Sequence, residues 1–201
     1  YRGYGPTHSQ STEKLFFGFP GIKIIAPSIF HNPGRLLEKA VNSEKLTLFI
    51  EHKLLYSEKQ TVPEGEWLVP LGEAEVKSEG DDITVVATSL MVHSTLKAAE
   101  ALSGEISVEV IDPRTLVPLD IEAILKSVEK TGRLLVVHEA CTRAGIGAEI
   151  VREIVEKAFD YLDAPPKVLG GLNIPMPYTP PLEKAVTPQE EDIIKAVREM
   201  V

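Results

Sequence analysis

The residues with the clearest chemical potential lie near the start of the chain. Residues 5–11 read Gly-Pro-Thr-His-Ser-Gln-Ser, so His8 follows a rigid Gly-Pro turn and precedes small hydroxyl residues. This pattern predicts a loop that holds His8 at an exposed corner just ahead of a helix. Because an imidazole gains or loses a proton near neutral pH, His8 is a candidate acid–base group at the edge of a site. A loop histidine that only hydrogen-bonds the backbone is the structural alternative.

Length and composition indicate an ordinary globular protein. The chain has 201 residues, of which 43% are hydrophobic and 25% are charged, values typical of folded domains. A chain of this length forms one large or two small domains and can bury about 70% of its unfolded surface. Its apolar runs are too short to span a bilayer, so no membrane partner is expected. The single Cys141 excludes an internal disulfide and a cysteine-rich zinc site, and it favours a reducing compartment.

Charge is distributed unevenly along the chain. The formal net charge is −9, which argues against nucleic acid as a partner because phosphate backbones require clustered Lys and Arg. Residues 1–60 carry 8 basic and 5 acidic side chains, whereas residues 61–201 carry 13 basic and 25 acidic ones. This division predicts two modules with different neighbours. An acidic, solvated face on the second module explains the same numbers without a specific basic partner.

The first module reads as the end of a larger α/β domain. The pattern predicts a helix through residues 15–17 capped at Ser9 or Ser11, a strand over 22–26, a helix opened by Asn32-Pro33, and a strand over 46–50. The expected apolar face of the second helix comprises Leu36, Leu37, Ala40 and Val41. Two strands and two helices are too few for a complete α/β domain.

The rest of the chain reads as a linker followed by a regular alternation of strands and helices. Residues 57–72 lose periodicity and are rich in Pro, Gly and charge, with Trp67 and Leu68 expected to pin this linker to a domain surface. Strands are predicted over 83–88, 106–111, 133–138 and 168–169, and helix faces over 92–102, 121–128, 150–158 and 193–197. This order predicts a mostly parallel sheet with helices on both faces and right-handed crossovers.

A glycine-rich turn in the second module permits two interpretations. Gly145-Ile146-Gly147 follows a predicted strand and opens a helix, an arrangement that can bind phosphate at the helix N-terminus. A dinucleotide fingerprint needs a third glycine where Ile150 stands. Close packing of the helix on the strand is the favoured explanation for these glycines.

Other titratable residues show weaker patterns. Cys141 is a candidate nucleophile, but no base is identifiable beside it, and a structural thiol is favoured. Glu51 and Glu139 end predicted strands, where α/β proteins often bind ligands, although interface hydrogen bonds are the favoured role for both. The remaining histidines lack metal-ligand spacing and are expected to be solvated or packed: His31, His52, His93 and His138.

These stretches together carry a family resemblance. They are Gly-Pro-Thr-His-Ser-Gln-Ser at 5–11, Pro-Gly-Ile-Lys at 20–23, Phe-Ile-Glu-His-Lys at 49–53, Leu-Tyr at 55–56, Asp-Pro-Arg-Thr-Leu-Val-Pro-Leu-Asp at 112–120, His-Glu-Ala at 138–140, and Gly-Ile-Gly-Ala-Glu at 145–149. Their ordered set resembles the beta subunit of thiamine-diphosphate-dependent 2-oxo acid dehydrogenases of the pyruvate and branched-chain types. The resemblance implies an incomplete pyrimidine-binding α/β domain over 1–56, a linker over 57–72, and a transketolase-type C-terminal domain over 73–201.

The resemblance implies an activity that is shared between chains. Members decarboxylate a 2-oxo acid on thiamine diphosphate and transfer the acyl group to lipoyllysine, within a heterotetramer in a multienzyme complex. The alpha chain holds magnesium and the diphosphate, and the family's beta-chain glutamate for the aminopyrimidine corresponds to a position upstream of Tyr1. The diphosphate motif is absent too, since Gly80-Asp81-Asp82 does not match it. No cofactor-binding residue is therefore assigned to this chain, and the isolated chain is expected to be inactive.

His8 is the catalytic residue that the resemblance assigns to this chain. The family's histidine at this position lies near the thiazolium and the lipoyl entrance, which implies a role in reductive acylation. The implied partners are an alpha subunit, a second beta subunit, and the lipoyl and subunit-binding domains of the dihydrolipoyl acyltransferase. The implied location is the cytoplasm or, alternatively, the mitochondrial matrix.

The resemblance also implies a candidate potassium site, because some relatives bind potassium. The potassium ligands of those relatives correspond to backbone carbonyls in the turn of Ala40, Val41, Ser43 and Lys45. In this chain Ser43 and Lys45 replace the usual Asp and Asn, and the positive charge of a lysine ammonium would repel a bound cation.

Two alternative functions remain open. One alternative is a non-catalytic module whose acidic second domain docks the acyltransferase core. The other is a relative of transketolase or deoxyxylulose phosphate synthase, which the Ser-Gln-Ser continuation disfavours.

Overall fold

The structure is a computed structural model, and it describes residues 3–28, 32–59, 61 and 69–201. Its larger sheet has five strands in the order β3-β5-β4-β7-β8. The bounds of these strands are β3 Glu75–Ser78, β4 Ile83–Ala87, β5 Val108–Asp112, β7 Leu134–Cys141 and β8 Lys167–Gly171. All neighbours pair in parallel except β3, which lies antiparallel to β5 at the edge. The predicted mostly parallel sheet is confirmed, although the edge strand β3 has no counterpart among the strands expected from the sequence.

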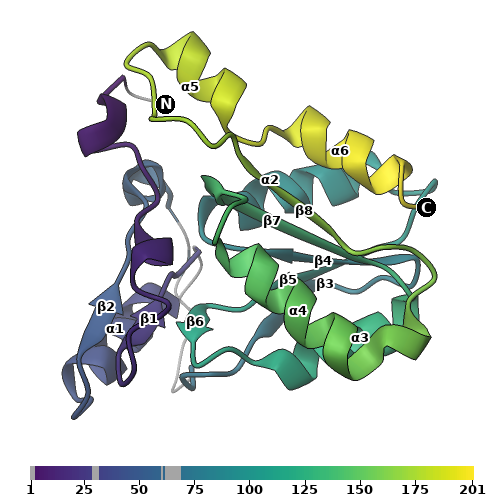
Figure 1. The fold of residues 1–201 in the computed structure, drawn as a ribbon, viewed down its shortest axis with the longest axis horizontal. Helices are drawn as coiled ribbons and strands as arrows, with labels where there is room; N and C mark the ends of the chain where they lie inside the picture. The colour runs from purple at the N-terminus through teal and green to yellow at the C-terminus, as the bar shows by residue number, and fades with distance from the viewer. Residues whose placement is uncertain (1–2, 29–31, 60, 62–68) are drawn as a thin grey trace.

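Helices cover both faces of this sheet, as predicted (Figure 1). One face carries α2 (Leu90–Ala101) and α6 (Glu190–Arg198), while the other carries α3 (Ile121–Thr131) and α4 (Ile146–Ala158). A short helix, α5 (Pro180–Val186), precedes α6 and was not predicted. Among the described residues, none of the helices combines the length and the apolar character needed to cross a bilayer.

Side chains on the central strand β4 alternate between two apolar cores. Ile83, Val85 and Ala87 pack beneath α2 and α6, whereas Val86 packs beneath α3 and α4. All four are fully buried, as expected of a parallel strand that is covered on both faces. The continuous apolar run in the sequence is therefore explained by burial on two sides.

Helix α3 begins and ends where the sequence predicts. The carboxylate Oδ1 of Asp120 accepts a hydrogen bond from the backbone N–H of Ala123 at 3.1 Å, which caps the first turn. Gly132 follows the last turn with a φ of 68°, the left-handed conformation that a C-terminal glycine provides.

The first module is completed by a strand from the second. Strands β1 (Lys23–Ile25) and β2 (Thr47–Phe49) pair in parallel, and β6 (Thr115–Val117) pairs antiparallel with β1. Helix α1 (Asn32–Val41) follows the expected helix start. Because β6 crosses from one module to the other, the two share a sheet as well as an apolar core. The division into residues 1–56, 57–72 and 73–201 stays a prediction.

Two local expectations for the first module are wrong. The predicted helix through residues 15–17 is only a 3-10 turn, η2 (Glu13–Leu15), because Gly18 and Pro20 leave too few residues to nucleate a helix. The predicted apolar face of α1 is also only partly buried. Leu36 is fully buried, but Leu37 is 46% and Val41 is 75% exposed. The expectations for His31, Trp67 and Leu68 concern residues outside the described part of the chain.

Candidate functional site

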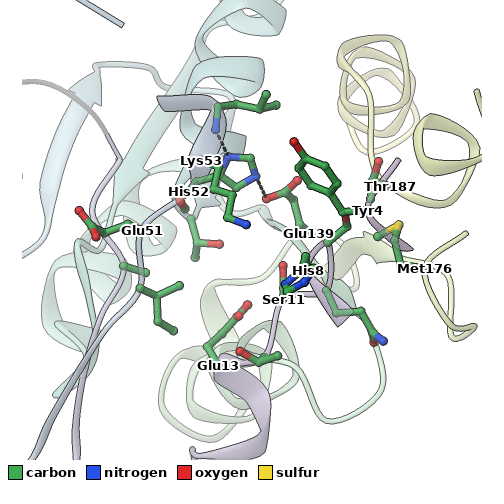
Figure 2. A pocket seen from close by; sticks show the side chains of 18 of the residues that line it. Tyr4, His8, Ser11, Glu13, Glu51, His52, Lys53, Glu139, Met176 and Thr187 are labelled. Atoms are coloured by element: carbon green, nitrogen blue, oxygen red, sulfur yellow. Dashed lines mark hydrogen bonds and ion pairs between the residues drawn. The ribbon is translucent and has the colours of Figure 1, made fainter. Parts of the chain in front are cut away.

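A cleft of about 250 Å³ lies where the two modules meet. Its walls come from the loop around His8, the segment after β2, the C-terminal ends of β4 and β7, and the chain that precedes α6. Figure 2 shows its labelled lining residues: Tyr4, His8, Ser11, Glu13, Glu51, His52, Lys53, Glu139, Met176 and Thr187. The open end of a parallel sheet is where α/β proteins bind ligands, so this cleft is the candidate site.

The loop that carries His8 is shaped by its own backbone. A 3-10 turn, η1 (Gly5–Thr7), begins at Gly5 with a φ of 65°, and a Cβ there would collide with the ring of Tyr178. The backbone N–H of Ser9 donates to the Gly5 carbonyl at 3.0 Å. His8 is exposed and lines the cleft. Its ring packs edge-on against the Tyr4 ring, with 6.5 Å between the ring centroids. The exposed position is confirmed, while the catalytic role of His8 stays a prediction.

A histidine–carboxylate pair joins the two modules across the cleft. His52 Nε2 lies 2.9 Å from Glu139 Oε2, and His52 Nδ1 accepts a hydrogen bond from the backbone N–H of Leu54 at 3.3 Å. An Nδ1 that accepts carries no proton, so the ring's proton is on Nε2 and is donated to Glu139. His52 also caps the 3-10 helix η3 (Lys53–Ser57). This contact lies within the chain, and the interface role expected for Glu139 stays a prediction.

Glu51 also bonds within the chain. Its Oε2 accepts a hydrogen bond from the Tyr56 hydroxyl at 3.1 Å. That contact anchors the segment after β2 to η3, next to His52. The strand ends singled out from the sequence do reach the cleft, but their carboxylates bind neighbours in the same module or across the module boundary.

Glu13 places a second carboxyl group near Glu139. Burial raises the pKa of the Glu13 carboxyl, and the negative charge of Glu139 raises it further. The side chain is only 8% exposed. A carboxyl group in such surroundings retains its proton to a higher pH than usual. The floor of the cleft therefore offers a proton-holding group as well as a hydrogen-bonding pair.

The charge of the cleft bears on the implied cofactor. Four glutamate side chains line it, against one ammonium from Lys53: Glu13, which holds its proton to a higher pH than usual, and Glu51, Glu139 and Glu183. Such a lining repels a diphosphate, and in the described part of the chain no three His, Cys, Asp or Glu side chains gather as a metal site. These residues fit neither the diphosphate nor its magnesium, and the expectation that another chain holds both stays a prediction. We therefore assign neither magnesium nor diphosphate binding to the side chains of this cleft.

The predicted potassium turn does not fit a cation well. The Lys23 ammonium donates to Ser43 Oγ at 2.9 Å, and the Ala40 carbonyl accepts from the Ser43 backbone N–H at 3.1 Å. Of the four carbonyls that potassium would need, that of Ala40 and that of Lys45, which accepts from the Thr47 hydroxyl at 3.2 Å, already accept hydrogen bonds, and the Lys23 ammonium brings a positive charge beside the turn. Binding of potassium by this turn stays a prediction.

The glycine-rich turn serves packing. A Cβ on Gly147 would lie 2.6 Å from Val168 Cγ1 and 2.8 Å from His138 Nε2. The His138 ring is fully buried, with Nδ1 2.9 Å from the Ala140 carbonyl, and burial lowers the pKa of its imidazole. The ring thus packs against the start of α4, where a phosphate would have to bind. The close-packing interpretation is confirmed.

Replacement of Gly147 by Ala should therefore destabilise the fold. Overpacking of this kind costs about 1–3 kcal/mol of unfolding free energy. Gly34→Ala is the matched control, because nothing lies within 4 Å of the added Cβ at Gly34 in α1. That variant should gain about 0.5–1 kcal/mol from helix propensity. Urea unfolding measures both, and a loss of the same size in the two variants would contradict the packing argument.

Comparison with known proteins agrees with this architecture. Residues 72–193 match the family described as Transketolase, C-terminal domain. The chain belongs to this family. Split gene transketolase, solved as an inactive beta4 tetramer, superposes with a TM-score of 0.75 at 21% identity, covering 93% of this chain and 59% of that one. At that identity the likeness establishes the fold alone.

Two curated relatives extend over nearly the whole of this transketolase-family chain. It is 41% identical over 194 residues to the pyruvate dehydrogenase E1 component subunit beta of Rickettsia bellii, covering 96% of this chain and 60% of that protein. It is 44% identical over 196 residues to the 2-oxoisovalerate dehydrogenase subunit beta of Bacillus subtilis, with the same coverage of 96% and 60%. The chain thus spans about three fifths of the length of these relatives. The family resemblance drawn from the sequence motifs is confirmed.

Proposed function

We propose that this chain forms part of the beta subunit of a thiamine-diphosphate-dependent 2-oxo acid dehydrogenase. The observation that carries the proposal is the cleft between the modules, whose rim is formed by the His8 loop and whose wall is formed by the His52–Glu139 pair. The relatives that are 41% and 44% identical support the same reaction class. Thiamine diphosphate, held in the assembled enzyme, would supply the nucleophilic carbon for decarboxylation of a 2-oxo acid.

The residues of this chain would serve the second half of the reaction. His8 stands exposed at the rim of the cleft, where the dithiolane of a lipoyl group can enter from solvent. A departing sulfur needs a proton, and an imidazole is suited to donate one near neutral pH. Glu139 and His52 hold the walls of the cleft in register by their hydrogen bond. The acyl acceptor is thus bound at the junction of the two modules.

The proposal also assigns partners and boundaries. An alpha subunit would supply the diphosphate and magnesium site, and a second beta subunit would complete a heterotetramer. The lipoyl and subunit-binding domains of an acyltransferase would dock on the assembled enzyme, in the cytoplasm or the mitochondrial matrix. Residues 1–56 would form the end of the pyrimidine-binding domain, 57–72 the linker, and 73–201 the C-terminal domain.

Reconstitution tests this function. The subunit that carries this sequence is co-expressed with its alpha subunit and assayed for decarboxylation of pyruvate and of 2-oxoisovalerate, with and without thiamine diphosphate. Cofactor-dependent turnover of either 2-oxo acid is expected, together with acyl transfer to an isolated lipoyl domain. A complex that binds the subunit-binding domain but turns over neither acid would favour the non-catalytic docking alternative instead.

A further inference from the structure

A cysteine and a lysine from distant parts of the chain meet beside the cleft. Lys14 lies in η2, and Cys141 is the last residue of β7, 127 residues further along the chain. The Lys14 Nζ and Cys141 Sγ atoms are 2.7 Å apart. No sequence motif joins the two residues, so the sequence alone identifies no group beside the thiol.

The pair is reachable from solvent. Both side chains line a hollow of about 260 Å³ whose walls also include Ser11, Glu139 and Met176. These three residues line the main cleft as well, so the two hollows adjoin. Cys141 is partly exposed. A small oxidant can therefore reach the sulfur from the same side as the ligands of the cleft.

The contacts of the sulfur orient it for reaction with the amine. The Cys141 thiol donates towards the Asn173 side-chain carbonyl at 3.3 Å. The Lys14 nitrogen lies closer to the sulfur than the Asn173 oxygen does. Its distance of 2.7 Å is typical of a hydrogen bond between nitrogen and oxygen, so it is short for a contact with the larger sulfur atom. A positive charge beside sulfur also stabilises a developing negative charge, the state in which cysteine acts as a nucleophile. Nucleophile and trapping group are therefore already in place.

We propose that a hydroperoxide converts this pair into a covalent lysine–cysteine cross-link. In the first step the Cys141 sulfur attacks the peroxide and an S–O bond forms as the O–O bond breaks. The leaving oxygen takes up the thiol proton, so sulfenic acid results together with water from hydrogen peroxide or an alcohol from an alkyl hydroperoxide. The sulfur is oxidised by two electrons and the peroxide is reduced. In the second step the Lys14 amine, having released its extra proton to solvent, attacks the sulfur. An S–N bond forms, the S–O bond breaks, and the hydroxyl leaves as water with the second proton of the amine.

The link would tie the loop of the cleft to the second module. Lys14 follows the His8 loop closely in sequence, and Cys141 is two residues beyond Glu139. A covalent bond between them restricts the unfolded chain and fixes the segment over residues 8–15 against β7. Thiol reductants break S–N bonds of this type, so the cross-link is a reversible modification of the site.

Peptide mapping after oxidation tests the proposal. The chain is treated with hydrogen peroxide, and samples with and without dithiothreitol are digested and analysed by mass spectrometry. We expect a peptide pair joined through Lys14 and Cys141, lighter than the sum of its parts by two hydrogen atoms, that separates on reduction. The cross-linked chain should also unfold at a higher temperature than the reduced one. Sulfinic acid at Cys141 without a link, an unmodified thiol, or a disulfide between two copies would each overturn the proposal.

Conservative variants separate the chemistry from folding. Lys14→Arg keeps the positive charge but replaces the amine, so the cross-link should be lost and sulfenic acid at Cys141 should become available to dimedone. Lys53→Arg changes another lysine of the adjoining cleft that does not touch the sulfur, and it should cross-link like the unmodified chain. Loss of two hydrogen atoms from the Cys141 peptide in Lys14→Arg would show that another nitrogen is the partner and would overturn the assignment.

Discussion

His8→Ala should lower acyl transfer to a lipoyl domain by roughly 10²–10⁴-fold, the usual contribution of a general acid, while dye-coupled decarboxylation survives. The separation follows from the place of His8. Its ring is exposed at the rim of the cleft rather than buried among the carboxylates. A group at the rim can reach an incoming dithiolane, whereas decarboxylation needs only the cofactor and the 2-oxo acid. The two rates are measured on the same assembled enzyme with excess lipoyl domain or with an artificial electron acceptor.

A second variant distinguishes proton donation from loop structure. His8→Gln retains a polar side chain that can hydrogen-bond but cannot donate a proton as an acid near neutral pH. It should behave like His8→Ala in acyl transfer. Because His8 is exposed, neither variant should shift the unfolding midpoint. Equal losses in both half-reactions, or full transfer activity in His8→Gln, would contradict the acid role and leave His8 as a loop residue.

The features that the sequence predicts well are those with a local cause. The parallel strands and the helices that cover them follow from apolar periodicity, and the ends of α3 follow from Asp120 and Gly132. The features it misses depend on distant residues. Strand β6 forms only because Thr115 and Val117 pair with β1, which lies about 90 residues earlier in the chain.

The same distinction applies to the candidate site. His8 is found from its local Gly-Pro turn, because a rigid turn and an ionisable ring are adjacent in sequence. The His52–Glu139 and Lys14–Cys141 pairs join the first module to the end of β7. Each partner alone resembles a solvated or packed side chain. Only the crossing of the two modules brings the two partners of each pair together, so no pattern in the sequence could pair them.

The burial of Asp112 makes the stability of the fold depend on pH. Asp112 is fully buried at the end of β5. Its carboxylate accepts from the Ser28 hydroxyl at 2.5 Å and from the Arg114 backbone N–H at 2.9 Å. Burial outweighs these hydrogen bonds and raises the pKa of Asp112 from 3.8 to about 6. The folded chain therefore binds a proton over a range of pH in which the unfolded chain has released it.

The sign of the effect follows from this difference in proton binding. Between about pH 4 and pH 6 the folded state binds more protons than the unfolded state, so the contribution of Asp112 to stability is present below this range and is lost as the pH rises through it. The difference of about two units between the pKa of Asp112 in the folded and unfolded states corresponds to a loss of about 3 kcal/mol of unfolding free energy. Asp112 also connects the two modules through its hydrogen bond with Ser28, because Ser28 follows β1 and Asp112 ends β5. The lost stability therefore concerns the junction of the modules.

Asp112→Asn should remove this dependence without removing the contacts. The amide oxygen can still accept from the Arg114 N–H, and the amide nitrogen can donate to the Ser28 hydroxyl. Relative to the unmodified chain, the variant should gain about 3 kcal/mol of unfolding free energy between pH 4 and pH 7, measured by urea unfolding at several pH values. Asp160→Asn, at an exposed aspartate, is the matched control and should leave the pH profile unchanged. Parallel profiles for Asp112→Asn and the unmodified chain would show that Asp112 stays ionised in the folded state, so that its two hydrogen bonds rather than its burial determine its charge.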